Sequence, residues 1–219
     1  MPSSTPFNDW IIFEDDALLA INKPSGILSV PGKPPNPTPC VQDYYPNHQS
    51  GLLTIHRLDM DTSGILLLAK TKAAHRALSI AFQNRQTKKT YDALCAGTLL
   101  QKQGRIQLPM RCDWDSRPRQ CIDFTQGRHA QTYWHLTKQH PDYCAVNLYP
   151  ITGRSHQLRL HMKMLGHPIL GDTLYADQTA CQQADRLCLH ASQLNFIHPE
   201  SLNNVALTCP SSFNLTISS

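Results

Sequence analysis

The amino-acid sequence predicts an α+β fold, with a largely antiparallel, mixed β-sheet and with helices and loops on its flanks. Many short segments alternate apolar and polar residues, and few have the apolar spacing of a helix. Strands and helices also show no regular alternation along the chain. At 219 residues, of which 41% are hydrophobic, the chain is long enough to bury a core. We therefore expect a single domain over residues 1–219.

The composition argues against a membrane or secreted protein. The longest apolar run covers residues 64–69, far short of the roughly 20 residues that a membrane-spanning helix needs. Residues 1–10 lack the charged and then apolar pattern of a secretory signal. Together with a mean hydropathy of −0.36, these features predict a soluble, cytoplasmic protein.

The cysteines agree with a reducing compartment. Eight of them occur, at positions 40, 95, 112, 121, 144, 181, 188 and 209, without CxxC spacing or close pairs. A zinc site is the alternative, but it needs more closely spaced ligands. We expect eight reduced thiols, most of them buried.

The first expected elements lie in the first third of the chain. Residues 10–13 and 17–22 are apolar runs separated by an acidic turn, which predicts a β-hairpin. Residues 31–39 contain five prolines and should form a surface loop. Residues 52–56 and 65–69 are expected strands on either side of a sharp turn at residues 59–64.

The remaining elements follow from periodicity. Residues 72–85 have helical spacing, with Ala74, Leu78, Ala81 and Phe82 on one face. A second helix is expected at residues 155–165. Further strands are expected at residues 90–96, 104–108, 120–125, 130–137, 144–149, 190–196 and 204–209.

Basic residues are concentrated in one segment. Residues 83–119 hold eight Lys or Arg and three Asp, a net charge of +5, whereas the rest of the sequence sums to −1. Such a concentration is typical of a phosphate-binding face, although a solvated face without a partner is the alternative.

Two polar clusters could carry chemistry. In the first, residues 56–64 (HRLDMDTSG), a Thr-Ser-Gly turn can hold Asp59 in a fixed direction, although an Asp that only caps a turn is the alternative. The second, residues 152–161 (TGRSHQLRLH), interleaves polar and apolar residues on the expected helix. The nucleotide-binding, serine hydrolase and zinc protease motifs GxGxxG, GxxxxGK[ST], GxSxG and HExxH are absent from the sequence.

The first cluster resembles the HRLDxxTSG motif of the RluA family of RNA pseudouridine synthases. Four further segments are similar to motifs of that family and occur in the same order: NKPSG at residues 22–26, KTYDA at 89–93, GRSHQLR at 153–159 and GHPILGD at 166–172. The resemblance extends from about residue 10 to about residue 210, without a departure in the motifs. It implies a pseudouridine synthase catalytic fold with a central active-site cleft, here without the S4-type domain that precedes it in many relatives.

The resemblance also implies a reaction without metal or cofactor, in which uridine in structured RNA becomes pseudouridine. Asp59 would be the catalytic carboxylate, as a nucleophile or as a base on the sugar. Arg159 would pair with Asp59, and we hypothesise that it positions this carboxylate and keeps it charged. Tyr91 would pack on the target uracil. Arg57 would lie beside the flipped nucleotide, and His56 would contact phosphate or pack in the interior.

The segment Cys112-Asp113-Trp114 with Arg117-Pro118 is similar to family members that modify two RNAs. These substrates are 23S ribosomal RNA and the anticodon arm of transfer RNA. We expect both as partners of a monomeric enzyme, and an enzyme for only one of them is the alternative. The sequence also leaves open a catalytically idle RNA-binding protein and an unrelated hydrolase that uses Asp59 and His56.

Overall fold

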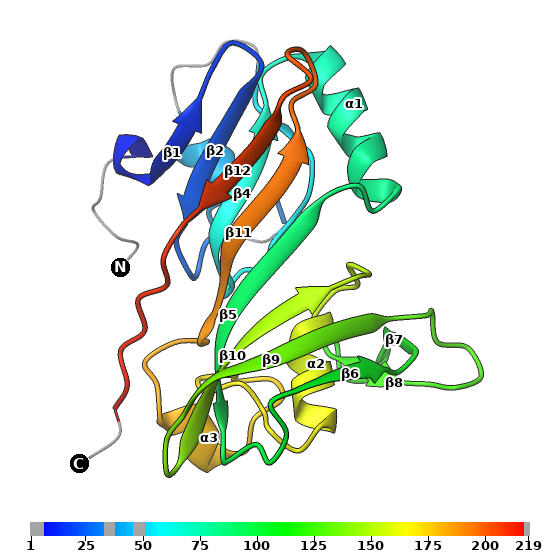
Figure 1. Cartoon of the computed structure of the whole chain (residues 1–219), viewed down its shortest axis with the longest axis vertical. Helices are drawn as coiled ribbons and strands as arrows, with labels where there is room; N and C mark the ends of the chain where they lie inside the picture. Colours follow the sequence, from blue (N-terminus) through cyan, green and yellow to red (C-terminus); the bar gives the residue numbers. More distant parts are fainter. Residues whose placement is uncertain (1–6, 33–37, 46–50, 217–219) are drawn as a thin grey trace. The chain divides into compact units, whose positions relative to one another are not determined.

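The computed structural model describes residues 7–32, 38–45 and 51–216 (Figure 1). The chain divides into two compact units. Unit 1 consists of Met1–Lys89 and His190–Ser211, and unit 2 of Thr90–Leu189 and Ser212–Ser219. Both units combine β-strands with short helices, and antiparallel pairing predominates, so the expected α+β class is confirmed. The expectation of one domain stays a prediction.

The sheet of unit 1 has β4 at its centre, and every residue of this strand is buried. β2 pairs antiparallel with one edge of β4, β1 pairs with β2, and β3 also pairs with β4. β11 runs parallel to β4, and β12 pairs antiparallel with β11. The strands are β1 (Ile11–Glu14), β2 (Leu18–Lys23), β3 (Leu53–Thr54), β4 (Ser63–Ala69), β11 (Leu189–Ile197) and β12 (Asn204–Thr208).

Local hydrogen bonds explain the helix and the first hairpin of unit 1. The carboxylate of Asp15 accepts the backbone N–H groups of Ala17 and Leu18 at 2.8 and 2.7 Å, which closes the expected hairpin between β1 and β2. Helix α1 (Lys72–Gln83) begins after Thr71, whose hydroxyl accepts the N–H of Ala74 at 3.1 Å. Two short 3-10 helices, η1 (Phe7–Trp10) and η2 (Val41–Tyr44), complete this unit.

Unit 2 contains a four-stranded antiparallel run in the order β5-β10-β9-β6 and a separate hairpin of β7 and β8. Its strands are β5 (Lys88–Ala96), β6 (Gln103–Gln107), β7 (Met110–Cys112), β8 (Gln120–Ile122), β9 (Gln131–Gln139) and β10 (Tyr143–Pro150). Helix α2 (Gln157–Met164) follows β10, and the short helix α3 (Gln178–Gln182) precedes β11.

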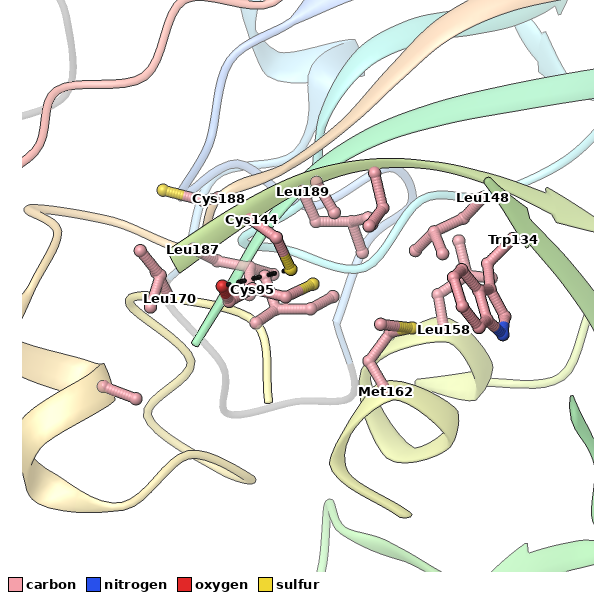
Figure 2. Close-up of a cluster of buried hydrophobic side chains, with 14 of the residues drawn as sticks. Cys95, Trp134, Cys144, Leu148, Leu158, Met162, Leu170, Leu187, Cys188 and Leu189 are labelled. Carbon is pink, nitrogen blue, oxygen red and sulfur yellow. Dashed lines mark hydrogen bonds between the residues drawn. The ribbon is translucent and has the colours of Figure 1, made fainter. Parts of the chain in front are cut away.

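Alternation along β10 builds the core of unit 2. Cys144, Val146 and Leu148 are buried, while their neighbours along the strand are more exposed. Leu158 and Met162 of helix α2 belong to the same cluster as Leu148, beside which they lie in Figure 2. Such close packing fixes the height and rotation of α2 in its unit.

The thiols contribute to packing. All eight cysteines are free, and five of them are buried, so the expectation that most of them are buried is confirmed. Their reduced state stays a prediction. Burial raises the pKa of Cys144 to about 11 and that of Cys188 to about 12. Both groups are therefore neutral thiols near neutral pH and poor nucleophiles.

Most predicted elements are present, with shifted ends. The second helix begins at Gln157 instead of residue 155, and the expected strand over residues 52–56 is reduced to two residues. Strand β7 and helix α3 were not predicted. The proline-rich loop falls largely on residues 33–37, outside the described residues. Within the described residues, no helix is both long and apolar enough to cross a membrane.

Candidate active site

Asp59 lies in unit 1, in the loop between β3 and β4. The loop alternates in exposure: Arg57 is exposed, Leu58 is buried and Asp59 is half-buried. The N–H of Thr62 donates to the carbonyl of Asp59 at 3.1 Å and closes a turn around this residue. Leu58 therefore anchors the loop, and the polar side chains on either side of it are partly or fully accessible.

The NKPSG segment holds this loop through its backbone. The hydroxyl of Ser25 donates to the carbonyl of Asp61 at 2.7 Å, and the N–H of Gly26 donates to that of Met60 at 3.0 Å. Just beyond the motif, Ser29 donates to the carbonyl of Leu58 at 2.8 Å and accepts its N–H at 3.0 Å. The carbonyls of Leu58, Met60 and Asp61 thus all accept hydrogen bonds, which restrains the backbone on both sides of Asp59.

Lys23 adds a further restraint on this loop, and the sequence did not single it out. Its side chain is fully buried, and its ammonium donates to the carbonyls of Pro24, Ile27 and Met60 at 2.8, 2.8 and 2.9 Å. Burial lowers the pKa of Lys23 to about 7, although the charges of Asp61 and Asp59 oppose this shift. A lysine that closes an apolar strand is the signal that could have identified it.

The Thr-Ser-Gly turn joins the Asp59 loop to β11. The hydroxyl of Ser63 lies 2.8 Å from Nδ1 of His190, whose Nε2 lies 3.0 Å from the carbonyl of Cys209. Gly64 has a φ of +107°, and a Cβ atom there would lie 2.4 Å from the carbonyl oxygen of Ala191. Only glycine permits this conformation at such a close approach, as the sequence indicated for the turn.

His56 has a packing role in the structure. Its Nε2 accepts the N–H of Leu67 at 3.0 Å, and its ring stacks on Phe82 with centroids 4.6 Å apart. Burial and the nearby charge of Lys89 lower the pKa of His56 to about 3. The ring is therefore neutral at physiological pH, which favours packing over binding of a phosphate; a contact with substrate stays a prediction.

Tyr91 and Arg159 lie in unit 2. Tyr91 is half-buried on β5, opposite Leu148 of β10, and packs against the core of this unit. Arg159 lies in the first turn of α2 and is 2% exposed. The sequence placed both residues in motifs, but it gave no partner for Arg159 within its own unit.

That partner is Asp172. Nε and Nη2 of Arg159 donate to its two carboxylate oxygens at 2.8 and 2.7 Å, and both side chains are buried. The carboxylate also accepts the N–H groups of Leu174 and Tyr175 at 2.9 and 3.1 Å. Asp172 was noted only as the last residue of the GHPILGD motif, because its contact with α2 depends on the tertiary fold.

Other residues of the GRSHQLR motif fasten helix α2. The amide of Gln157 donates to the carbonyl of Gln131 and to the hydroxyl of Thr132, both at 3.0 Å, and accepts the hydroxyl proton of Thr152 at 2.7 Å. His156 precedes the helix with a φ of 54°, and its Nδ1 lies 2.9 Å from the hydroxyl of Tyr175. The polar residues of this motif therefore orient the helix that carries Arg159.

The candidate residues thus fall into two groups. Arg57 and Asp59 share one restrained loop of unit 1, close in the chain to the packed His56. Tyr91 and Arg159 belong to two different elements of unit 2. In the part of the chain that the structure describes, no group of three or more His, Cys, Asp or Glu could hold a metal ion.

Comparisons with known proteins agree on one family. A family model described as RNA pseudouridylate synthase matches residues 17–164. The dual-specificity RNA pseudouridine synthase RluA of Vibrio cholerae is 46% identical over 198 residues, which cover 90% of this chain and 81% of that protein. The protein of the same name from Escherichia coli K12 is 44% identical over 215 residues, which cover 95% and 96%. The solved structure of human RNA Pseudouridylate Synthase Domain Containing 1 superposes with a TM-score of 0.81 at 26% identity, over 100% of this chain and 94% of that one.

Proposed function

The chain belongs to the RNA pseudouridylate synthase family and is an RNA pseudouridine synthase, and on this premise we propose that it modifies both 23S ribosomal RNA and the anticodon stem-loop of transfer RNA. The observation that carries the proposal is the sequence identity of 44–46% to relatives named as dual-specificity enzymes, over most of their length. The exposed Trp114, with the guanidinium of Arg117 3.9 Å from its ring centroid, is consistent with an RNA-contacting hairpin. We further propose that the enzyme is a cytoplasmic monomer.

We propose Asp59 as the catalytic carboxylate. In the reaction the bond between N1 of uracil and C1′ of ribose breaks, the base rotates, and a bond forms between C5 and C1′. The proton on C5 then leaves, and N1 gains a proton, so the reaction is redox-neutral. The hydrogen bonds to the carbonyls of Met60, Asp61 and Leu58 support this role, because they restrain the backbone that carries Asp59 and so reduce its reorganisation during the reaction.

The other proposed residues bind and orient the nucleotide. Tyr91 offers an aromatic face to the flipped uracil, and the exposed Arg57 takes the space that the nucleotide leaves. Arg159 positions Asp59 and keeps it charged. Asp59 belongs to unit 1, and Tyr91 and Arg159 belong to unit 2; we propose that residues 1–219 form a single catalytic domain.

The first test is release of tritium from RNA labelled at uracil C5, since isomerisation sends this hydrogen to solvent. Transcripts of a 23S hairpin and of a transfer RNA anticodon arm would be compared for the wild-type protein and for Asp59→Asn. We expect release from both transcripts with the wild type. With Asp59→Asn we expect loss of release by more than about 1,000-fold and retained RNA binding.

Each remaining outcome has a defined meaning. Release from only one transcript would contradict dual specificity and favour the narrower enzyme. Full release by Asp59→Asn would remove Asp59 from the catalytic role. Binding of both transcripts without release by the wild type would support an RNA-binding protein that lacks the activity on these targets. Release from total RNA of cells that lack the enzyme would then distinguish a different target from an idle protein.

A further inference from the structure

We infer that Asp172 is a positioning residue of this enzyme: it fixes the guanidinium of Arg159, and its loss lowers turnover more than RNA binding. The inference rests on the proposed function, because it needs Arg159 to act on Asp59. It begins from a buried ion pair with two parallel hydrogen bonds, from Nε and Nη2 of Arg159 to the carboxylate of Asp172. Such a pair sets both the position and the plane of a guanidinium.

Asp172 can fix Arg159 because it is itself held. Oδ1 accepts three hydrogen bonds, from Leu174 N–H, Tyr175 N–H and Nη2 of Arg159, and Oδ2 accepts one from Nε. The carboxylate cannot rotate without breaking several of them. Its backbone is fixed as well, since its carbonyl accepts the N–H of Ala176 at 3.1 Å. A small shift of Asp172 would therefore move Arg159 with it.

Tyr175 restrains the face of the same guanidinium. Cζ of Arg159 lies 5.4 Å from the ring centroid of Tyr175, within the range of a cation–π contact. The Tyr175 hydroxyl accepts the N–H of Gln120 at 2.7 Å and lies 2.9 Å from Nδ1 of His156. With one edge on Asp172 and one face on Tyr175, the group has a single orientation in unit 2.

Stability alone is a weak explanation for this pair. A buried ion pair often stabilises a protein no more than apolar residues of the same size, because both charges lose their hydration. Here the pair is 2% and 0% exposed and lies beside the buried residues of α2. Fixing the direction of a charge is something that apolar residues at these positions would not achieve.

The chain offers a matched control in Asp123. Its Oδ1 accepts the N–H groups of Thr125 and Gln126, both at 2.8 Å, and its Oδ2 accepts Nε of Arg111 at 2.6 Å. The arrangement is similar to that of Asp172, but with a single hydrogen bond from the arginine and at a partly exposed position, where 37% of the Arg111 side chain and 18% of the Asp123 side chain are accessible. Asp123 has no part in the proposed mechanism, so Asp123→Asn reports what loss of such a pair does by itself.

The test measures kcat and KM for tritium release by Asp172→Asn, Asp123→Asn, Arg159→Lys and the double variant Arg159→Lys/Asp172→Asn. We expect Asp172→Asn to lower kcat by about 100-fold with KM within about threefold, and Asp123→Asn to change either by less than about twofold. In the Arg159→Lys background, Asp172→Asn should lower kcat by less than about fivefold, because the orientation that it protects is already lost. Independent effects that multiply in the double variant would overturn the inference.

A second variant separates positioning from folding. If circular dichroism shows that Asp172→Asn is unfolded, Asp172→Glu keeps the charge but displaces the carboxylate by one methylene. We expect Asp172→Glu to melt within a few degrees of the wild type and still to lose kcat by more than about tenfold. Wild-type kcat in a folded Asp172→Asn or Asp172→Glu protein would contradict the inference.

Arg159→Ala tests the proposed role of Arg159 separately from the inference about Asp172. Near-normal turnover by a folded Arg159→Ala would remove the proposed role of Arg159, and the inference about Asp172 with it. An inactive Arg159→Ala beside a fully active Asp172→Asn would overturn only the inference. Loss of activity in both, with RNA binding retained, is the result that we expect.

Discussion

At the residue scale, His56 should make the folded protein sensitive to acid. Its pKa is about 3 in the folded state and 6.5 in a model peptide. Between these values the unfolded chain binds a proton at this site and the folded protein does not, so the free energy of unfolding falls as pH falls. From about pH 7 to about pH 5 the loss from this one group should be about 2 kcal/mol.

His56→Gln tests this prediction, since glutamine does not titrate and its Oε1 can replace Nε2 as acceptor for the N–H of Leu67. Urea unfolding of the wild type and of His56→Gln at about pH 7 and about pH 5 gives the loss of free energy of unfolding for each protein. When one loss is subtracted from the other, the contributions of the remaining titrating groups cancel. The wild type should lose about 2 kcal/mol more than His56→Gln on acidification. Parallel losses would show that the imidazole is protonated in both the folded and the unfolded protein.

Single residues differ in how far the sequence alone could identify them. Asp59, Arg57, Tyr91 and Arg159 lie in contiguous motifs, so their similarity to a family suggested roles for them, and those roles stay predictions. Lys23 lies in a motif too, but its importance comes from the carbonyl of Met60, which is 37 residues away in the chain. Contacts of this kind depend on the tertiary fold, and no local pattern reports them.

At the element scale, helix α1 and the central strands were predicted because apolar spacing fixed their buried faces. The three residues of β7 and the five of α3 are too few to show a repeating pattern of apolar residues, so the sequence did not predict these elements. The early end of β3 has a specific cause. Thr54 is the last residue of β3 and pairs with Leu68 of β4. The N–H of Leu67, the preceding residue of β4, donates to Nε2 of His56 and not to a carbonyl of β3.

The loop that carries Asp59 should depend on Lys23 for both stability and activity. In Lys23→Met the carbonyls of Pro24, Ile27 and Met60 lose a buried donor. We expect a loss of about 3 kcal/mol in the free energy of unfolding. We also expect a lower kcat, because Met60 adjoins Asp59. Chemical denaturation and tritium release at a temperature where the variant is folded would measure the two effects.

Lys70→Met is the control for that experiment. Lys70 pairs with Glu14 at 3.1 Å and donates to the carbonyl of Asp15 at 2.6 Å, with 22% of its side chain accessible. A partly exposed pair contributes less than about 1 kcal/mol. The two variants should therefore differ in stability, and only Lys23→Met should lower kcat. Equal effects would show that the depth of burial of Lys23 has no special consequence for the loop.

At the scale of the whole molecule, the structure shows which cations of the basic segment, residues 83–119, are accessible to RNA. Six of its eight basic residues are exposed: Arg85, Lys88, Lys102, Arg105, Arg117 and Arg119. The charge of Arg111 is offset by Asp123. Lys89 is half-buried, 5.8 Å from the ring centroid of Phe82, so its substitution would also disturb the packing of His56. A test of phosphate binding should therefore use the exposed positions alone.

Lys88→Glu provides that test, with Lys72→Glu as an exposed control on α1 of the same unit. If Lys88 contacts phosphate, reversing its charge should weaken RNA binding by about tenfold at low salt. The slope of log affinity against log salt should fall by about one, because fewer counterions are released on binding. Lys72→Glu should change neither quantity by more than a small margin, and turnover of bound RNA should stay normal in both. Equal affinities and slopes for Lys88→Glu and the wild type in a filter-binding titration would place the RNA-binding face elsewhere on the molecule.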